Sequence, residues 1–587
     1  MTESVERSDE RWDLDRERGL LIGWDVAIPM DDGLVLRADV FQSVHGGQHP
    51  VILGYGPYGK GLAFQEGYPD QWRIIEERYP EALEGSSNVY QNWEVVDPEQ
   101  WVPEGYVCVR VDSRGAGRSP GFLDPWSPRE TRDLYECIEW AAAQPWSNGR
   151  IGLSGISYLA MNQWTVASLQ PPHLAAICAW EGAADFYRDT TYHGGIRCVN
   201  WDNWYEMQVM SVQHGVGDRG PRNPLTGETA CGPETLTDEE LAANRVDFAA
   251  DIRTHPLDDD YHRGRSPIWD RVTIPLLSAA NWGGQALHAR GNFEGFARAA
   301  SAHKWLEVHG GEHWTAFYAP YGVELQKRFF GHFLKDEDTG WHHQPRLLLQ
   351  LQRINGTFQE RGESEWPLAQ TRWTRLYLDA SERSLQEQPG QRPESISYDP
   401  LTGNAEFLSA PFERETELTG PSAATLFVSS ATTDADLFLI LRLLDPDGEE
   451  VVFQGSNDPR TALGKGWLRA SHRWLDPDLT LDYRPYHTHD RIEPLQPGAV
   501  YELAIEIWPL SVIAPAGYRL GLVVQGRDYE RDEAAQLANF RVPLRGSGPY
   551  LHTDPDDRPV DPFAGRVTVH TGTTTPSSLL LPVIPES

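Results

Sequence analysis

The feature that most constrains the fold is a change of pattern near residue 350. Before it, short apolar runs such as VILGYG and GYVCVRVD alternate with segments of helical spacing; after it, β-rich runs follow one another with no helical pattern between them. Strands that alternate with helices are typical of a parallel α/β sheet. Closely spaced strands separated by turn residues are typical of an all-β sandwich. We therefore predict an α/β domain followed by a β-sandwich of jelly-roll type.

The alternation is interrupted once, where the chain becomes polar and aromatic and has helix-like pieces but no clear strands. In open α/β sheets the chemistry lies in loops at the carboxyl ends of the strands. An insertion at this place is therefore expected to cover the site as a helical cap. The predicted divisions are a mobile N-terminal arm (1–20), the two parts of the α/β domain (21–185 and 267–350), the cap (186–266) and the β domain (351–587).

The charge of the chain limits its partners. Its 587 residues include 51 Lys and Arg against 86 Asp and Glu, a net charge of −35. Such a surface repels the phosphates of nucleic acids and of anionic membranes, so neither is an expected partner. No apolar run approaches the roughly 20 residues of a membrane span, and the charged N-terminus lacks the apolar segment of a signal peptide. We expect a cytoplasmic protein; a homo-oligomer is compatible with the sequence, but nothing indicates one.

Metal-binding and disulfide patterns are weak in this sequence. The five cysteines show no C-x-x-C spacing, which argues against a zinc site or a disulfide framework. The pairs His342–His343 and His487–His489 resemble metal ligands, but no further ligands are evident near them. We interpret these histidines as packing or surface residues, and we expect neither a metal nor an organic cofactor.

A candidate nucleophile lies in the segment RIGLSGISYLAMNQWTVASL (150–169), which has the pattern of a strand, a tight turn and a helix. Ser157 falls in the turn, two residues after Gly155. That is the setting of a nucleophile elbow, in which small residues let strand and helix approach while the serine stays exposed. Leu159 replaces the second glycine of the usual G-x-S-x-G pattern. A serine in an ordinary turn is the alternative, but the context favours Ser157 as a nucleophile.

A serine nucleophile needs a base, which in this setting is a histidine further along the chain. His313 is the best candidate because it follows the last sheet-like run, in VHGGEHW, on a Gly-Gly loop. His309 ends that run and is interpreted as a structural histidine. His288 and His303 lie in helix-like stretches and are interpreted as ordinary residues.

The oxyanion that forms after attack needs two hydrogen-bond donors. The backbone N–H of Tyr158, next after the nucleophile, is the first. The loop GYGPYGKG, which follows an earlier strand, offers the phenol of Tyr58 as the second, with Tyr55 as the fallback. The alternative is that both of these tyrosines simply pack at a turn.

Together these motifs resemble the CocE/NonD family of α/β-hydrolases, which includes cocaine-esterase-like enzymes and X-Pro dipeptidyl-peptidases of the S15 type. The resemblance runs through GYVCVRVDSRGAGRSPG, GLSGISYLA, PLLSAANW, VHGGEHW and the β-rich tail, nearly the whole chain from about residue 20. It implies an α/β-hydrolase fold with a helical cap and a C-terminal jelly roll. It also implies that Ser157 is the nucleophile, His313 the base and Tyr58 an oxyanion donor; Ala160 replaces the last glycine of the family's G-x-S-Y-x-G motif.

One position departs from the family. Its catalytic aspartate follows a tryptophan after the penultimate strand, and here Asn281–Gly284 (NWGG) has a glycine at that place. Glycine cannot orient an imidazolium, so the acid comes from elsewhere or the triad is incomplete. We predict Glu181, which follows the run LAAICAW and keeps the acid's place in chain order; Asp185 and Glu294 are the alternatives. Glu312, beside the histidine, is expected to point away from it.

The aromatic side chains Phe186, Tyr187, Trp204 and Trp282 are candidates for lining a substrate pocket, although packing of the cap on the sheet explains them equally well. The predicted function is that of a serine hydrolase that cleaves carboxylic esters of small molecules through an acyl-enzyme. The alternative within the class is an amidase or an X-Pro dipeptidyl-peptidase-like peptidase. A distant alternative is a non-catalytic binding or scaffold protein.

Overall fold

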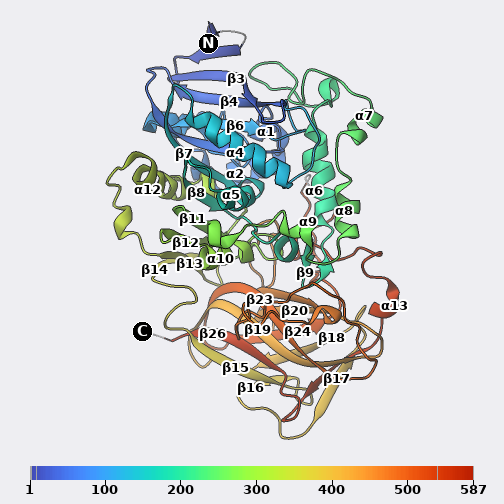
Figure 1. Ribbon diagram of the computed structural model, residues 1–587. Helices are drawn as coiled ribbons and strands as arrows, with labels where there is room; N and C mark the ends of the chain where they lie inside the picture. The colour runs from blue at the N-terminus through green and yellow to red at the C-terminus, as the bar shows by residue number, and fades with distance from the viewer. Residues whose placement is uncertain (1–2, 8–9, 538–539, 586–587) are drawn as a thin grey trace.

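The protein consists of an α/β domain and a β domain that lie against each other (Figure 1). The structure is a computed structural model, and it describes residues 3–7, 10–537 and 540–585. In Figure 1 the α/β domain runs from blue to green, and the β domain lies at the other end in yellow to red. The last two strands of the α/β sheet, β13 (Leu347–Gln352) and β14 (Phe358–Glu363), extend slightly beyond the predicted boundary at residue 350.

One sheet organises the α/β domain, in the strand order β1-β2-β3-β4-β6-β5-β7-β8-β11-β12-β13-β14. The strands from β6 to β13 in that order pair parallel, and antiparallel strands flank them on both sides. This is an α/β-hydrolase-like arrangement, as predicted. The bounds of the strands between the edges are β3 Leu20–Pro29, β4 Val35–Ser43, β5 His49–Gly56, β6 Val107–Asp112, β7 Ser147–Ile156, β8 Leu174–Trp180, β11 Leu276–Asn281 and β12 Lys304–His309.

Four longer helices pack on this sheet: α4 (Pro128–Ala142), α5 (Tyr158–Leu169), α10 (Ala289–Arg298) and α12 (Pro320–Lys335). They bury the parallel strands on both faces, which is why those strands are apolar throughout. Helix α4 begins after an N-cap serine: the Ser127 hydroxyl accepts a hydrogen bond from the Glu130 amide at 3.3 Å. None of the helices in the described residues combines the length and apolar character needed to cross a membrane.

The N-terminal segment, predicted to be a mobile arm, instead extends the sheet. Strand β1 (Glu3–Arg7) pairs with β2 (Glu10–Asp15), and β2 pairs antiparallel with β3; residues 1–2 and 8–9 lie outside the described residues. Trp12 is buried, and the Asp13 carboxylate accepts a hydrogen bond from the Trp24 indole at 2.9 Å. The charged composition of this segment was a poor guide, because the carboxylates of Asp13 and Asp15 are buried and hydrogen-bonded within the fold.

The segment 186–266 is built from short helical pieces, the form predicted for a cap. A small hairpin of β9 (Tyr192–His193) and β10 (Ile196–Arg197) lies among them. In Figure 1 these elements lie along one side of the α/β domain and reach the β domain, where β9 and β10 contact β22 (Gly464–Arg469). The helical pieces are η3 Phe186–Thr191, α6 Asn200–Trp204, η4 Tyr205–Val209, η5 Met210–Val212, η6 Gly217–Arg219, α7 Asp238–Ala243, α8 Phe248–Thr254 and α9 Asp260–Arg263.

The β domain is a barrel that closes on itself. The pairing order around it is β19-β23-β22-β20-β24-β18-β16-β15-β26, and β26 pairs again with β19. The predicted all-β domain is confirmed, but it is a closed barrel, and its jelly-roll topology stays a prediction. Its remaining strands in the described residues are β15 Arg372–Asp379, β16 Ser384–Gln386, β17 Glu394–Tyr398, β18 Asn404–Ser409, β19 Thr416–Ser430, β20 Asp436–Leu444, β21 Glu450–Val451, β23 Tyr501–Ala514, β24 Arg519–Gln525, β25 Val567–Thr571 and β26 Ser578–Ile584.

A hydrophobic cluster joins the sheet, the cap and the β domain. Phe438, Trp467, Trp508 and Tyr550 of the β domain belong to the same buried cluster as aromatic side chains of the other two parts. Apolar area that is removed from water in this way holds the parts together. The β domain is therefore packed into the molecule next to the cap and can contribute residues to a site beneath it.

Candidate active site

The loops that follow the parallel strands share one edge of the sheet, and the predicted site residues lie in them. Ser157 stands between β7 and α5 with φ 55° and ψ −114°, a strained backbone conformation for a residue other than glycine. A Cβ on Gly155 would lie 2.5 Å from the Cβ of Leu159. The glycine at 155 thus leaves the space that Leu159 fills, which explains how the turn tolerates the loss of its second glycine.

The Ser157 hydroxyl contacts a histidine that sequence reasoning missed. Its Oγ lies 3.1 Å from Nε2 of His288. His288 is the N-cap residue of α10 and is fully buried, so its interpretation as an ordinary helical residue is wrong. One signal was available: His288 follows β11 by only a few residues, in the loop where the family places its acid.

His313 is held by the acid that the sequence predicts. Its Nδ1 lies 2.8 Å from Oε2 of Glu181, which directly follows β8 and has a left-handed φ of 45°. The other carboxylate oxygen of Glu181 accepts a hydrogen bond from the Asn281 side chain at 3.1 Å. Burial alone would raise the pKa of Glu181, but His313 and His309 lower it to about 2. Glu181 is therefore a fixed negative charge beside the imidazole.

His309 acts as a structural partner of Glu181. Its Nε2 lies 3.1 Å from Oε1 of Glu181, and its Nδ1 lies 2.8 Å from Glu307. Burial lowers its pKa, but these two carboxylates raise the pKa to about 10. A cation buried between Glu307 and Glu181 compensates their charge, which fits its interpretation as a structural histidine.

A second carboxylate occupies the other nitrogen of His313. Oε1 of Glu94 lies 3.1 Å from His313 Nε2. Burial lowers the pKa of His313, but Glu181 and Glu94 raise it to about 10. Burial raises the pKa of Glu94 itself to about 7, although contact with His313 lowers it. The sequence offers no signal for Glu94, because it lies in an irregular loop among 86 acidic residues.

Glu181, His288 and His313 lie close together but do not form an ion cage. One ligand atom each of Glu181, His288 and His313 lies within 4.8 Å of the others. However, the two imidazole rings are parallel, with centroids 5.1 Å apart and an interplanar angle of 8°. The lone pairs of an imidazole lie in its ring plane, so two parallel rings do not direct them at one ion, and His313 Nδ1 is already bonded to Glu181. The geometry favours acid–base chemistry here.

Tyr58 lies beside the serine and keeps its proton. Burial raises its pKa well above the usual range, although the nearby Trp204 indole and Ser157 hydroxyl lower it. The phenol oxygen accepts a hydrogen bond from the Trp204 indole at 3.2 Å, which leaves its O–H free to donate. The amide of Tyr158 is among the first N–H groups of α5, which have no acceptor within the helix. The fallback, Tyr55, is buried in a different core cluster.

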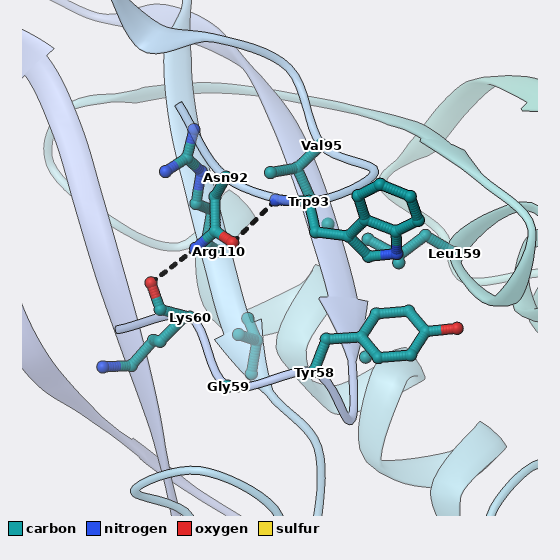
Figure 2. A pocket seen from close by; sticks show the side chains of 11 residues that line it. Tyr58, Gly59, Lys60, Asn92, Trp93, Val95, Arg110 and Leu159 are labelled. Carbon is teal, nitrogen blue, oxygen red and sulfur yellow. Dashed lines mark hydrogen bonds between the residues drawn. The ribbon is translucent and has the colours of Figure 1, made fainter. Parts of the chain in front are cut away.

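The loop that carries Tyr58 is anchored at Lys60. The Lys60 ammonium lies 2.9 Å from Asp39, and the Lys60 amide donates to Asp112 at 2.6 Å. Figure 2 shows the other anchor, in which the Asn92 side chain donates to the Lys60 carbonyl at 2.6 Å. The loop is therefore held by several contacts at Lys60, two residues after Tyr58.

A cavity opens on these groups. Trp204 lies in its wall, as predicted, together with aromatic and amide side chains from the sheet, cap and β domain. The lining residues are Tyr58, Gln71, Trp93, Glu94, Trp126, Ser157, Asn200, Trp201, Trp204, Gln208, Leu287, His313, Asn457, Phe540 and Tyr550. The β domain also braces the histidine loop, because the His313 amide donates to the Ser456 carbonyl at 3.0 Å.

Three of the predicted pocket residues do not line this cavity. Phe186 and Tyr187 pack within the cap, where the Tyr187 hydroxyl donates to the Pro256 carbonyl at 2.8 Å. Trp282 lies in another core cluster, and its indole donates to the Gln350 carbonyl at 2.8 Å. The prediction was wrong for these three, because aromatic composition alone does not separate a pocket wall from packing.

The alternative acids lie elsewhere too. Asp185 caps η3 and pairs with Arg188 at 2.8 Å, and Glu294 pairs with Arg484 at 2.7 Å. Glu312 points away from its neighbouring histidine and pairs with Arg78 at 2.8 Å. Among the described residues that were predicted as acids, Glu181 is the one in contact with His313.

Comparison with known proteins places this architecture. Residues 32–315 match the family model of the X-Pro dipeptidyl-peptidases (S15 family), and residues 339–580 match that of the X-Pro dipeptidyl-peptidase C-terminal non-catalytic domain. A crystal structure of a CocE/NonD family hydrolase from Staphylococcus aureus is 32% identical and covers 99% of this chain and 96% of its own, with a TM-score of 0.82. The chain belongs to the CocE/NonD family of hydrolases.

Curated relatives of this CocE/NonD hydrolase include esterases. A putative serine esterase of Mycobacterium tuberculosis is 26% identical over 514 residues, which cover 73% of this chain and 79% of the relative. The cocaine esterase of Rhodococcus is 23% identical over 580 residues, which cover 86% and 91%. These likenesses support a serine hydrolase and leave the choice between ester and X-Pro peptide substrates open.

The loop that holds the family's acid position lies against the β domain. A Cβ on Gly283 would lie 2.7 Å from the backbone of Gln454 and Gly455 in the β domain. A Cβ on Gly284 would lie 3.2 Å from the Asn281 carbonyl. In this CocE/NonD hydrolase the loop after β11 is thus pressed against the β domain, and the carboxylate beside His313 comes from the loop after β8.

Proposed function

We propose that this protein hydrolyses carboxylic esters of small molecules through an acyl-enzyme on Ser157. The observation that carries the proposal is that Ser157, on a strained turn between β7 and α5, opens into the same cavity as a histidine bonded to a buried carboxylate. A serine, a histidine and an acid in this combination catalyse acyl transfer, whatever their order in the sequence.

The base in this proposal is His313, with Glu181 as its orienting acid. Ser157 attacks the substrate carbonyl carbon, and its proton passes to Nε2 of His313. Glu181 stabilises the resulting imidazolium through Nδ1. The bond to the leaving group then breaks, and water removes the acyl group by the same steps in reverse, after which Ser157 recovers its proton from His313. The Tyr58 hydroxyl and the Tyr158 amide donate to the oxyanion.

His288 has a different role, that of positioning the hydroxyl. Its Nδ1 has no hydrogen-bond partner among the described residues. A buried N–H without an acceptor is rarer in proteins than an unpaired acceptor, so the proton belongs on Nε2. Nε2–H then donates to Ser157 Oγ and leaves the serine proton free to turn toward His313. His288 has no carboxylate partner in the described structure and is a poor base.

Esters are favoured over amides because an alcohol leaves more readily than an amine. X-Pro dipeptidyl-peptidase activity is the second candidate. It is favoured by the family-model matches and by one observation: the cavity lining contains a carboxylate, Glu94, that could pair with the terminal ammonium of a peptide. No Lys or Arg occurs among the described residues of the lining, so an anionic substrate is not expected.

Two measurements test the proposal. A fluorophosphonate probe should label the wild-type protein with one equivalent, and Ser157→Ala should abolish the label. Steady-state rates on p-nitrophenyl esters of varied acyl length, compared with X-Pro p-nitroanilides, should show the higher kcat/KM on the esters. A folded wild-type protein that neither reacts with the probe nor turns over any of these substrates would support a binding or scaffold role. Faster cleavage of the X-Pro anilides would assign the peptidase.

A further inference from the structure

The Glu94 side chain enters the site from a loop that is held on two sides. Its carbonyl oxygen accepts a hydrogen bond from the Ile156 amide at 3.2 Å, just before the nucleophile. Its φ of 61° is left-handed, a conformation that a glutamate adopts only when its surroundings enforce it. Two residues earlier, Asn92 ties the loop to Lys60, as Figure 2 shows. The two loops that carry Glu94 and Tyr58 are therefore tied to each other by a hydrogen bond.

The two carboxylate oxygens of Glu94 have different surroundings. Oε1 lies 3.1 Å from His313 Nε2. Oε2 is buried and has no hydrogen-bond partner among the described residues. The neighbouring Trp93 indole lowers the pKa of Glu94, but its N–H does not meet Oε2 in hydrogen-bond geometry. A buried carboxylate oxygen without a partner is costly, and this one belongs to a side chain that lines the cavity with Ser157. The missing partner is expected to be a bound molecule.

We propose that Glu94 is the general acid that protonates the leaving group when Ser157 is acylated. The inference deepens the proposed function and rests on it. It makes poor leaving groups, such as the alkoxides of alkyl esters and the amines of amides, substrates of this site. Activated aryl esters, whose phenolates leave without a proton, do not need Glu94.

The protons of this step balance as follows. The reactive state holds one proton on Ser157, one on His313 Nδ1 and one on Glu94 Oε2. Attack moves the serine proton to His313 Nε2. As the bond from the carbonyl carbon to the leaving oxygen or nitrogen breaks, that atom takes the proton from Glu94 Oε2, and Glu94 Oε1 takes the proton from His313 Nε2. The products are the acyl-enzyme, the neutral leaving group, neutral His313 and a protonated Glu94.

The contacts of His313 in the resting structure are compatible with this proton transfer. In the resting structure both ring nitrogens of His313 face carboxylate oxygens, so one proton is shared between Nε2 and Glu94. In the wild type, transfer of that proton to Glu94 leaves Nε2 unprotonated and places a proton on the acid. In a variant with an uncharged residue at position 94, no carboxylate at Nε2 raises the pKa of His313, so the base does not depend on this transfer. Burial raises the pKa of Glu94 to about 7, the range in which a carboxyl group is most effective as a general acid near neutrality.

The test compares Glu94→Gln with the wild type on a series of acetate esters from p-nitrophenyl through phenyl and trifluoroethyl to ethyl. We expect kcat/KM of the variant to stay within about 3-fold of wild type on the p-nitrophenyl ester and to fall about 10²-fold or more on the ethyl ester, as loss of a general acid does. The slope of log(kcat/KM) against leaving-group pKa should become steeper. A loss that is the same on every ester would overturn the acid role.

The matched control is Glu312→Gln. Glu312 is also a buried carboxylate whose pKa burial raises to about 7, and it adjoins His313 in sequence but pairs with Arg78. The ratio of its kcat/KM to that of the wild type should be the same for every leaving group. Labelling of Glu94→Gln by the fluorophosphonate probe checks that the site is folded. If the label is lost, Glu94→Asp, which keeps an ionisable carboxyl group, replaces it and should retain part of the ethyl-ester rate.

A pH profile and a separate outcome complete the test. Wild-type kcat/KM on the ethyl ester should fall at alkaline pH as the Glu94 proton is lost, whereas the p-nitrophenyl ester should show no such fall. If Glu94→Gln instead raises KM only for substrates with a free amino group, Glu94 binds an ammonium and the acid role is wrong. Failure of wild-type turnover on every ester would contradict the proposed function itself, independently of Glu94.

Discussion

Two histidines of the candidate site offer a comparison: one contacts the serine, and the other lines the same cavity as the serine. His288 and His313 are both buried, and their rings lie parallel with centroids 5.1 Å apart. Carboxylates contact both nitrogens of His313 and raise its pKa to about 10, whereas burial lowers the pKa of His288 well below its usual value. The same side chain thus becomes a charged and a neutral group within one cavity. Partners, not burial, decide which imidazole can carry a proton.

Replacing each histidine in turn tests this difference between them most directly. We expect His313→Ala to lower kcat on a p-nitrophenyl ester by on the order of 10⁴–10⁶-fold, because the base is lost. His288→Asn should lower it only about 10-fold, the value of one hydrogen bond to the nucleophile. Steady-state kinetics on both purified variants would measure this. The reverse ranking would make His288 the base, in line with its contact to Ser157.

Removing the charge that distinguishes the two histidines should have the next largest effect. Glu181→Gln keeps the size of the side chain but cannot stabilise a His313 imidazolium, so we expect kcat to fall about 10⁴-fold. The matched control is Glu294→Gln, which changes a predicted alternative acid that pairs with Arg484 and not with His313. A near-normal rate in Glu181→Gln would remove Glu181 from the mechanism.

The smallest expected effect is on stability, and it has opposite signs for the two residues. The raised pKa of His313 stabilises the folded state below the unfolded pKa of about 6.5, and that contribution is lost as pH rises toward 10. The lowered pKa of His288 has the opposite consequence, because the unfolded chain gains a proton below about 6.5 that the folded state does not.

Urea unfolding at several pH values would measure both contributions. His313→Gln should lose less stability than wild type between pH 7 and 10, and His288→Gln should lose less between pH 7 and 5. Identical pH dependence in both variants and the wild type would show that the two imidazoles do not differ in charge.

The site also divides into residues that the sequence predicts, such as His313, and residues that it does not predict, such as His288. Ser157 could be found because an elbow needs a strand, a small residue and a helix within a few positions. His313 and Glu181 could be found because parallel strands present their following loops at one edge. Each of these signals is local to one strand and its loop, so a single sequence carries it.

Glu94 and His288 could not be found in this way. Glu94 reaches the site through a left-handed backbone in an irregular loop, and only tertiary contacts place it against His313. His288 has the sequence surroundings of a helix start, and its contact with the serine depends on where the sheet places α10. The N-terminal arm failed for a related reason, because charge composition does not reveal that an acid such as Asp13 is buried with a partner.

The central claim is that Ser157 carries the acyl group. Rapid mixing with a p-nitrophenyl ester, acid quenching and intact-protein mass spectrometry test it most directly. The account predicts a transient mass increase of one acyl group, located by peptide mapping on the peptide that contains Ser157 and absent from Ser157→Ala. Sustained turnover without any acylated protein, or an acyl group on another residue, would contradict it.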